Sequence, residues 1–330
     1  MSRRIFLTGA TGYIGGALAR RLAARGDAVR ALVRATSDPA AVAALHGLGV
    51  ETFVGDVTDR ASMREGMAGA DWVVHAAADL DFYAAEERVR RINVEGADHV
   101  ASLAYKLGCG RFLLLSSIAA FTGSPPDGAP ASEETAMGTD FPSLYSATKR
   151  AGEEAVRAWT KKGLRTNVVW PSLVYGPPGK KAGANALLRL FARGRLPVLV
   201  GADRRTSWIY LDDLVDGLVR VMERAEPGRD YLMTGDVATT REVVHRTCEL
   251  AGAKPPKVEL PLWLARVAAK AATPYYKLRG FKNPLPPGQL ESLGRNWAFD
   301  DTRARRELEW KPRGLEEGLP VTVEHILGRD

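Results

Sequence analysis

Two short segments contain residue types that together could carry out hydride-transfer chemistry. Residues 8–15 read TGATGYIG and directly follow the apolar run Ile5–Leu7, whereas residues 145–149 read YSATK. A glycine-rich turn between a strand and a helix is typical of a dinucleotide-binding site. A tyrosine and a lysine four residues apart share one face of a helix and can form a proton-donating pair. The combination predicts nicotinamide-dependent oxidoreductase chemistry, which neither segment would indicate alone.

Each glycine of the first segment has a separate task. Gly9 lets the chain turn tightly out of the strand, Gly12 lets the backbone approach a pyrophosphate, and Gly15 lets the helix pack closely on the sheet. The start of the helix then presents free N–H groups and a favourable dipole to the phosphates. At this turn we predict dinucleotide contacts from Gly9, Thr11, Gly12, Tyr13, Ile14 and Gly15.

The end of the second predicted strand bears on the choice of dinucleotide. An acidic residue there grips the ribose 2′-hydroxyl of NAD, whereas an arginine accommodates the 2′-phosphate of NADP. This chain has Arg34 there, followed by Ser37, and its first acid is Asp38. The planar cation of Arg34 and the hydroxyl of Ser37 favour NADP, with NAD as the alternative. A solvent-exposed surface arginine without a ligand is the competing interpretation of Arg34.

Two further segments are expected to border the dinucleotide. Asp56 and Val57 follow the third predicted strand and can lie against the adenine. Ala76, Ala77 and Ala78 follow the fourth strand and provide small side chains where the backbone must pass close to the cofactor.

The proposed proton donor is Tyr145. A free phenol has a pKa near 10, and the ammonium group of Lys149 is expected to lower the pKa of Tyr145. Lys149 could also hold the nicotinamide ribose. Ser117, at the end of the fifth predicted strand, can hydrogen-bond the reacting oxygen; if the register differs by one residue, Ser116 takes this role.

Bulk properties agree with an ordinary soluble protein. The chain has 330 residues, 45% hydrophobic and 26% charged, with a net charge of +7 spread along the sequence without a long basic run. We therefore expect no nucleic-acid partner. Cys109 and Cys248 have no metal-binding spacing, so no metal site is predicted, and two isolated cysteines fit a cytoplasmic location. No apolar stretch approaches the length of a membrane span.

Alternating strands and helices must position these residues. Strands are predicted at Ile5–Thr8, Ala28–Val33, Glu51–Val54, Trp72–His75, Arg111–Ser116 and Thr166–Trp170, with helices at Tyr13–Arg25, Arg60–Met67, Glu87–Leu107 and Tyr145–Lys161. The pattern predicts an α/β fold with a Rossmann-like, doubly wound parallel sheet. Residues 1–170 would form the NADP-binding domain, to which about 205–235 return. Residues 171–330 would form mainly a smaller C-terminal substrate lobe.

With these motifs in place, the chain resembles the extended short-chain dehydrogenase/reductases, within the epimerase/dehydratase superfamily. The glycine-rich turn, Ser117, and the Tyr145–Lys149 pair all match, as does Asn93 on the helix before the fifth strand. The resemblance implies that Asn93 holds a proton-relay water. Residues 171–177 (PSLVYGP) resemble the segment beside the nicotinamide carboxamide, and 205–213 (RTSWIYLDD) resemble a later family segment. These matches imply cofactor contacts from Pro171, Leu173 and Val174, and substrate contacts from Ser117, Tyr175 and Arg205.

The family admits several activities. Arg34 favours an NADP-dependent reductase or dehydrogenase acting on a bulky apolar substrate, as in dihydroflavonol reductases, 3β-hydroxysteroid dehydrogenases and hopanoid-associated relatives. Arg205 and the VYGP sequence favour a nucleotide-sugar epimerase or dehydratase that retains NAD. A third alternative is a non-catalytic NADP sensor, but such proteins typically lose the tyrosine or the lysine. We expect the reductase.

The C-terminal part of the chain has its own charge pattern. Seven bases and one acid lie between residues 254 and 282, and aromatic residues alternate with them; the bases are Lys254, Lys257, Arg266, Lys270, Lys277, Arg279 and Lys282, and the aromatic residues are Trp263, Tyr275, Tyr276 and Phe281. The segment predicts either a lobe helix with basic residues outside or a peripheral membrane contact. The family resemblance also implies a homodimer.

Overall fold

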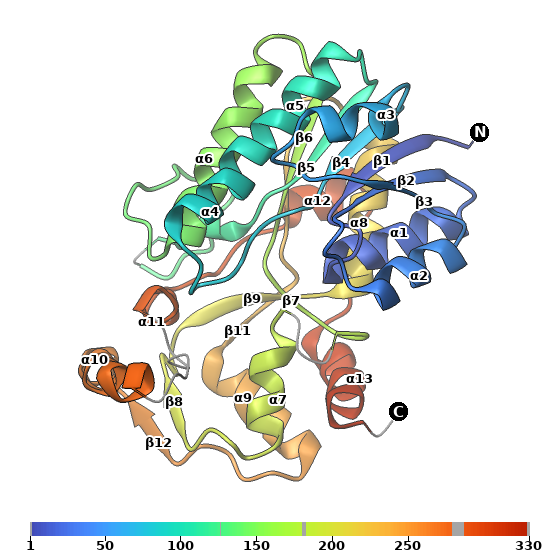
Figure 1. Ribbon diagram of the computed structural model, residues 1–330. Helices are drawn as coiled ribbons and strands as arrows, with labels where there is room; N and C mark the ends of the chain where they lie inside the picture. The colour runs from blue at the N-terminus through green and yellow to red at the C-terminus, as the bar shows by residue number, and fades with distance from the viewer. Residues whose placement is uncertain (1, 126, 180–182, 279–286, 329–330) are drawn as a thin grey trace.

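A seven-stranded parallel sheet forms the centre of the computed structural model, which describes residues 2–125, 127–179, 183–278 and 287–328 (Figure 1). The strand order is β10-β6-β5-β4-β1-β2-β3. The strands are β1 (Arg4–Thr8), β2 (Ala28–Val33), β3 (Glu51–Val54), β4 (Trp72–His75), β5 (Arg111–Leu115), β6 (Thr166–Pro171) and β10 (Tyr231–Met233). All six strands expected from the sequence are present, and the predicted doubly wound fold is confirmed.

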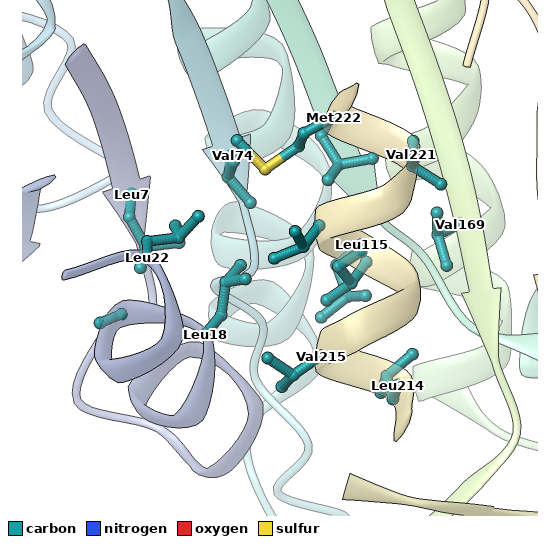
Figure 2. Close-up of a cluster of buried hydrophobic side chains, with 14 of the residues drawn as sticks. Leu7, Leu18, Leu22, Val74, Leu115, Val169, Leu214, Val215, Val221 and Met222 are labelled. Carbon is teal, nitrogen blue, oxygen red and sulfur yellow. The ribbon is translucent and has the colours of Figure 1, made fainter. Parts of the chain in front are cut away.

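Helices cover both faces of this sheet, as its apolar strands require. One face carries α1 (Tyr13–Ala24), α2 (Pro39–Gly47), α8 (Leu211–Arg224) and α12 (Thr302–Glu307); the other carries α3 (Arg64–Met67), α5 (Gly96–Lys106) and α6 (Leu144–Thr160). Figure 2 shows the first interface, where Leu18 and Leu22 of α1 and Leu214 and Met222 of α8 meet the sheet. Two continuous apolar layers thus hold the strand ends in place.

The long helix predicted over Glu87–Leu107 is interrupted. It consists of α4 (Glu86–Arg90), a π-helical turn (Arg91–Glu95) and α5. The shorter one, Arg60–Met67, is a 3₁₀ turn (Ala61–Met63) followed by α3. A π turn inserts one extra residue into a helix and is frequent at functional sites. It carries Asn93, one of the predicted site residues.

In the described residues, two small sheets and five helices build the C-terminal lobe, which lies below the main sheet in Figure 1. β7 (Leu173–Tyr175), β9 (Arg205–Tyr210) and β11 (Asp236–Thr239) form one sheet, and β8 (Val198–Val200) pairs with β12 (Val258–Leu260). The helices are α7 (Asn185–Ala192), α9 (Thr240–Ala251), α10 (Leu262–Leu278), α11 (Pro287–Leu293) and α13 (Leu315–Leu327). The sequence predicts that residues of about 205–235 return to the first domain. In this range α8 packs on the main sheet and β10 is one of its strands, whereas β9 belongs to the lobe.

Strand order changes direction between β1 and β4, and this is where doubly wound folds bind ligands. From β1 the chain proceeds outward to β2 and β3, and then crosses to β4 on the other side. In folds of this kind the ligand crevice lies between the loops that follow the carboxyl ends of these two strands, here β1 and β4. The predicted glycine-rich turn and Ala76–Ala78 border this crevice.

Replacing Gly15 with alanine tests how closely the first helix approaches the turn. A Cβ at Gly15 would lie 2.2 Å from the Gly9 carbonyl oxygen, which belongs to the backbone and cannot rotate away. We expect Gly15→Ala to lower the free energy of unfolding by about 1–3 kcal/mol, as overpacking does. Chemical denaturation measures this change.

Gly47→Ala is the matched control. Gly47 ends α2, and a Cβ there has no neighbour within 4 Å among the described atoms. This substitution should leave stability unchanged or raise it by up to about 1 kcal/mol, because alanine restricts the unfolded chain. Equal destabilisation by the two substitutions would contradict the close contact at Gly15.

Candidate active site

The glycine-rich turn has the geometry of a phosphate cradle. Gly9 has φ +77°, and a Cβ there would lie 2.8 Å from the backbone of Ala76. Gly12 is the exposed N-cap of α1, and no side chain caps this helix. The first N–H groups of α1 therefore point toward the crevice without a side-chain acceptor, as binding a pyrophosphate requires. A dinucleotide fits this cradle.

Neighbouring residues of the turn have structural contacts. The Tyr13 hydroxyl donates to the Gly176 carbonyl, and burial raises the pKa of Tyr13 above its usual value. Ile14 packs against the core under α1, and Thr11 is partly exposed. Tyr13 thus ties the turn to the segment after β7, and its expected contact with the dinucleotide stays a prediction.

A tight turn places Arg34 and Ser37 together at the end of β2. The Arg34 N–H donates to the Ser37 hydroxyl at 3.0 Å, and the Ser37 N–H donates to the Arg34 carbonyl at 2.9 Å. Arg34 is exposed. The nearest acid in the sequence, Asp38, is occupied differently, because its carboxylate caps α2 by accepting from the Ala40 N–H. The strand end thus offers a cation where NAD-binding proteins use a carboxylate.

The expected adenine and nicotinamide borders also lie at this edge. Asp56 accepts hydrogen bonds from the N–H and the hydroxyl of Thr58, both at 2.8 Å, while Val57 is buried. Ala76 and Ala78 are partly exposed after β4, and the Ala77 N–H donates to Thr8 at 3.3 Å. The backbone of Ala76 and Ala77 lies close against Gly9, so the two segments meet at this edge of the sheet.

Tyr145, Lys149 and Ser117 come together above the end of β5. Tyr145 and Lys149 lie on the first turns of α6, which Ser143 caps by accepting from the Ser146 N–H. The Lys149 ammonium donates to the Leu115 carbonyl at 2.8 Å. Ser117 hydrogen-bonds the Tyr145 hydroxyl, whereas Ser116 points to the other side, toward Glu153. The register that pairs Ser117 with Tyr145 is the one expected from the sequence.

The expected lowering of the Tyr145 pKa is wrong for this structure. Burial of the hydroxyl raises the pKa of Tyr145 to about 12, although the hydrogen bond to Ser117 acts in the opposite direction. The free-energy cost of removing a phenolate from water exceeds the stabilisation that the nearby groups provide. A phenol with this pKa is protonated at neutral pH, so Tyr145 is set up to donate a proton.

Lys149 has a neighbour that the sequence reasoning missed. Burial lowers the pKa of Lys149 to about 8, and the carboxylate of Glu153, one helical turn further along α6, raises it. Tyr145, Lys149, Glu153 and Arg157 follow one another at spacings of four, so they share a face of the helix. Extending the four-residue spacing of the Tyr–Lys pair by one turn would have found Glu153.

Glu153 is itself buried, 1% exposed, and fully engaged. It accepts hydrogen bonds from the Ser116 hydroxyl at 3.0 Å, the Trp170 indole at 2.7 Å and the Arg157 guanidinium at 2.9 Å. Arg157 in turn donates to Asp230 at 2.9 Å. Positive and negative groups therefore alternate from Lys149 to Asp230. This alternation offsets the free-energy cost of burying the Glu153 carboxylate.

His75 lies below the same site as a neutral group. Its Nδ1 is 2.8 Å from the Thr8 hydroxyl, and the ring is buried at the end of β4. Burial, together with the nearby Lys149 charge, lowers the pKa of His75 to about 3. His75 therefore adds no second positive charge beside Lys149 at neutral pH.

The side chain of Asn93 is used for positioning. Its oxygen accepts from the Asp79 N–H at 2.7 Å, and its amide nitrogen donates to the Asp79 carbonyl and the Thr148 hydroxyl, each at 3.0 Å. Both amide hydrogens of Asn93 are therefore already hydrogen-bonded to protein acceptors. Asn93 ties the loop after β4 to α6, and the relay water implied by the resemblance stays a prediction.

Residues after β6 are divided between the site and the lobe. Pro171 is buried at the end of β6, two residues beyond Val169, which pairs with Leu115 of β5. This pairing brings Pro171 next to the β5 end that carries Ser117. Val174 is buried and Leu173 is partly exposed on β7.

Neither substrate contact expected in the lobe adjoins Tyr145. Tyr175 is 1% exposed and packs edge-on against Tyr210, with ring centres 5.5 Å apart, so the expectation of substrate binding is corrected to a core position. Its side chain faces Gly318 of α13 because β7 pairs with β9 inside the lobe. Arg205 is exposed and donates to the Gly128 carbonyl at 3.3 Å.

A cavity of about 180 Å³ opens beside Tyr145, and most of its lining surface is apolar, although polar side chains line it as well. Its lining residues are Asp79, Leu80, Asp81, Phe82, Val89, Ser143, Leu144, Tyr145 and Gly288. Leu80 and Phe82 are 59% and 44% exposed, which is unusual for large apolar side chains. The loop after β4 thus supplies an apolar wall that the sequence reasoning did not identify.

Comparisons with known proteins place this geometry in a family. The model of the NAD-dependent epimerase/dehydratase family matches residues 5–233. Sterol demethylase protein B of Methylococcus capsulatus is 31% identical over 96% of each chain. A 4-hydroxy-2-methyl-3-oxo-4-farnesyl-3,4-dihydroquinoline-1-oxide ketoreductase of Stigmatella aurantiaca is 29% identical over 94% of this chain and 92% of its own. The solved structure of gox2253 is 27% identical, with a TM-score of 0.85 over 99% of each chain.

The chain therefore belongs to the NAD-dependent epimerase/dehydratase family, within the extended short-chain dehydrogenase/reductases. Members of this family bind a nicotinamide dinucleotide, and the glycine-rich turn and the crevice described above fit such a group. The family assignment makes the protein an oxidoreductase of this class.

Replacing Glu153 with glutamine tests its effect on Lys149. Lys149 is charged below its pKa of about 8, so activity that needs the ammonium group should fall as the pH rises through this value. Removing the carboxylate lowers the pKa of Lys149 further, so the alkaline limb of the kcat/KM profile should move to lower pH in Glu153→Gln.

Glu154→Gln is the matched control. Glu154 is the next residue on α6, is 58% exposed and pairs with Arg150 on the surface. This variant should keep the wild-type pH profile. An unshifted profile in Glu153→Gln, or an equal shift in both variants, would contradict the role of Glu153.

Proposed function

We propose that the protein is an NADP-dependent reductase or dehydrogenase that interconverts a carbonyl and a secondary alcohol on a medium-to-large hydrophobic molecule. The observation that carries this proposal is the cavity in which Tyr145 meets Leu80, Phe82, Val89 and Leu144. The ketoreductase of Stigmatella aurantiaca and sterol demethylase protein B have apolar molecules in their names, which supports the same substrate class.

The residues of the site suit carbonyl reduction. The bound dinucleotide supplies the hydride. Tyr145, with a pKa of about 12, carries its proton at neutral pH and would donate it to the carbonyl oxygen, while Ser117 orients that oxygen. Lys149 lies one turn along α6, where its ammonium group would hold the ribose and stabilise the phenolate left after proton transfer. In the reverse direction the same phenolate would accept the proton.

The proposed preference for NADP rests on the end of β2. Arg34 offers a planar cation with several N–H donors, which suits a phosphate. The Asp38 carboxylate caps α2. Among the described residues at the end of β2, Arg34 therefore stands where an NAD-binding protein has the carboxylate that binds the ribose.

Replacing Tyr145 with phenylalanine tests the reaction. We expect NADPH oxidation in the presence of bulky apolar ketones by the wild-type protein, and turnover at least about 10²-fold slower in Tyr145→Phe. NADPH affinity should be nearly unchanged, because only the hydroxyl is removed. Stopped-time turnover assays and fluorescence titration measure the two quantities.

Three results would overturn this assignment. Near-wild-type turnover by Tyr145→Phe would remove Tyr145 from the reaction. Turnover of a nucleotide sugar with no reduction of any apolar ketone would instead favour an epimerase or dehydratase, and binding of NADPH without any turnover would favour a sensor.

Arg34→Asp tests the cofactor choice. We expect this change to raise the Kd for NADPH by more than about tenfold and to affect NADH much less, because only NADPH carries the 2′-phosphate. Arg20→Asp, an equal charge change at an exposed position on α1, is the control. Equal losses for both dinucleotides, or tightly held NAD released from the denatured wild-type protein, would contradict the assignment.

A further inference from the structure

Helix α10 exposes an unusually apolar outer face. Trp263 is 64% exposed, Val267 57% and Leu264 37%, and Val258, on the strand just before the helix, is 50% exposed. Trp263, Leu264 and Val267 form one strip, because these positions share a helical face, and Val258 adds an exposed valine on the strand that leads into the helix. An isolated exposed leucine needs no explanation, but a tryptophan and three aliphatic side chains in one short segment mark an interaction surface.

The opposite face of α10 is packed. Ala265 is 4% exposed and contacts Leu290 of α11 and Val200 of β8, and Leu262 lies against Gly294. The small core under α10 is thus complete, so the outer strip is not needed to hold the helix in place. Its side chains remain available for another surface.

Exposed basic residues lie on the two loops that lead into β8 and β12, and on α10 itself. Arg193 and Arg195 are exposed on the loop before β8, and Lys254 and Lys257 are exposed on the loop before β12; the two loops lie side by side, since Val258 pairs with Val198. Lys270 is exposed on α10. The sequence has no acid within residues 185–202, 250–258 or 262–278.

The acids closest along the chain are already paired. Glu259 and Asp203 both bind Arg241, at 2.7 and 2.6 Å, and Glu291 of α11 pairs with Arg266. Arg279, Phe281 and Lys282, with the side chains of Tyr275, Tyr276 and Lys277, lie outside the described residues. The described part of this segment therefore combines exposed apolar side chains with exposed bases that have no acid in the same stretches of sequence.

We propose that this surface, Val258, Trp263, Leu264 and Val267 with the bases Arg193, Arg195, Lys254, Lys257 and Lys270, docks on an anionic lipid bilayer. Apolar side chains with a central tryptophan enter the boundary of a membrane, and surrounding lysines and arginines bind its negative headgroups. No helix in the described part of the chain is long and apolar enough to span a membrane, so α10 lies along the surface.

A lipid surface fits better than a second copy of the chain. In a symmetric dimer the same patch faces itself, which would bring the exposed bases of the two copies close together, while the acids of the segment are already held by Arg241 and Arg266. An anionic bilayer neutralises these bases instead. Each base near such a surface contributes about 1 kcal/mol, which is about fivefold in affinity.

Docking would also place the catalytic cavity next to the lipid. The inner face of α10 packs on α11, and Gly288 of α11 lines the cavity that contains Tyr145. Given the proposed function, an apolar substrate dissolved in the bilayer would then reach Tyr145 past α11. Docking itself does not depend on turnover.

Vesicle co-sedimentation of the full chain tests the proposal. We expect binding to vesicles of phosphatidylcholine with phosphatidylglycerol, weaker binding to pure phosphatidylcholine, and loss with rising salt. Trp263→Ser/Val267→Ser should weaken binding at least about tenfold, since both side chains lose their apolar contact. Lys254→Glu/Lys257→Glu should weaken binding to the anionic vesicles by at least about 25-fold, from two bases at about fivefold each.

Two control variants make changes of the same kind elsewhere. Val321→Ser alters an exposed valine of α13, and Lys106→Glu/Lys161→Glu reverses two charges at the ends of α5 and α6, far from the lobe in Figure 1. Both should bind vesicles like the wild type. NADPH titration and thermal unfolding of every variant verify that it is folded.

Several outcomes would overturn the proposal. These are absence of binding to anionic vesicles by folded wild-type protein, or equal losses in the control variants. A dimer measured by light scattering that Trp263→Ser/Val267→Ser dissociates, without vesicle binding, would assign the surface to a second copy. Because the assay needs no substrate, its failure leaves the proposed reductase activity untouched, and the reverse also holds.

Discussion

The buried carboxylate of Glu153 is the interaction on which the site depends. It joins α6 to β5 through Ser116, to β6 through Trp170, and, by way of Arg157, to Asp230 before β10. A carboxylate this deep would be very costly alone. Here the Glu153 carboxylate raises the pKa of Lys149, so that this buried lysine can stay charged beside the protonated Tyr145. The packing of the helix and the proton chemistry therefore share one set of hydrogen bonds.

Much of this arrangement could be predicted from the sequence because it is local. The strand β2, for example, has an apolar run bounded by Gly26–Asp27 and by Arg34, and its predicted ends agree with the structure. The glycine-rich turn follows from residue types whose geometry allows few alternatives, since Gly9 and Gly15 each meet backbone atoms. Fold class and cofactor class depend on such short-range constraints.

Other features depend on contacts between distant segments and were not predictable in this way. Tyr175 is buried because β7 pairs with β9, a partner more than thirty residues later in the chain, which no local pattern reveals. The raised pKa of Tyr145 depends on how deeply its hydroxyl is buried when α6 packs on the sheet. The four-residue spacing of Tyr145 and Lys149 does not predict this burial. Glu153 lies outside the motif that drew attention to the helix, although its spacing was visible.

The hydrogen bonds of Asn93 have a consequence for how specificity can change. They hold the loop after β4 through the backbone of Asp79, and so the course of that loop does not depend on the side chains of Leu80 and Phe82. Those two side chains line the cavity but belong to no buried core cluster. Substitutions there can reshape the cavity at little cost in folding stability. Natural or engineered substitutions in this loop can therefore change which substrates the cavity accepts, while the proton-transfer residues remain unchanged.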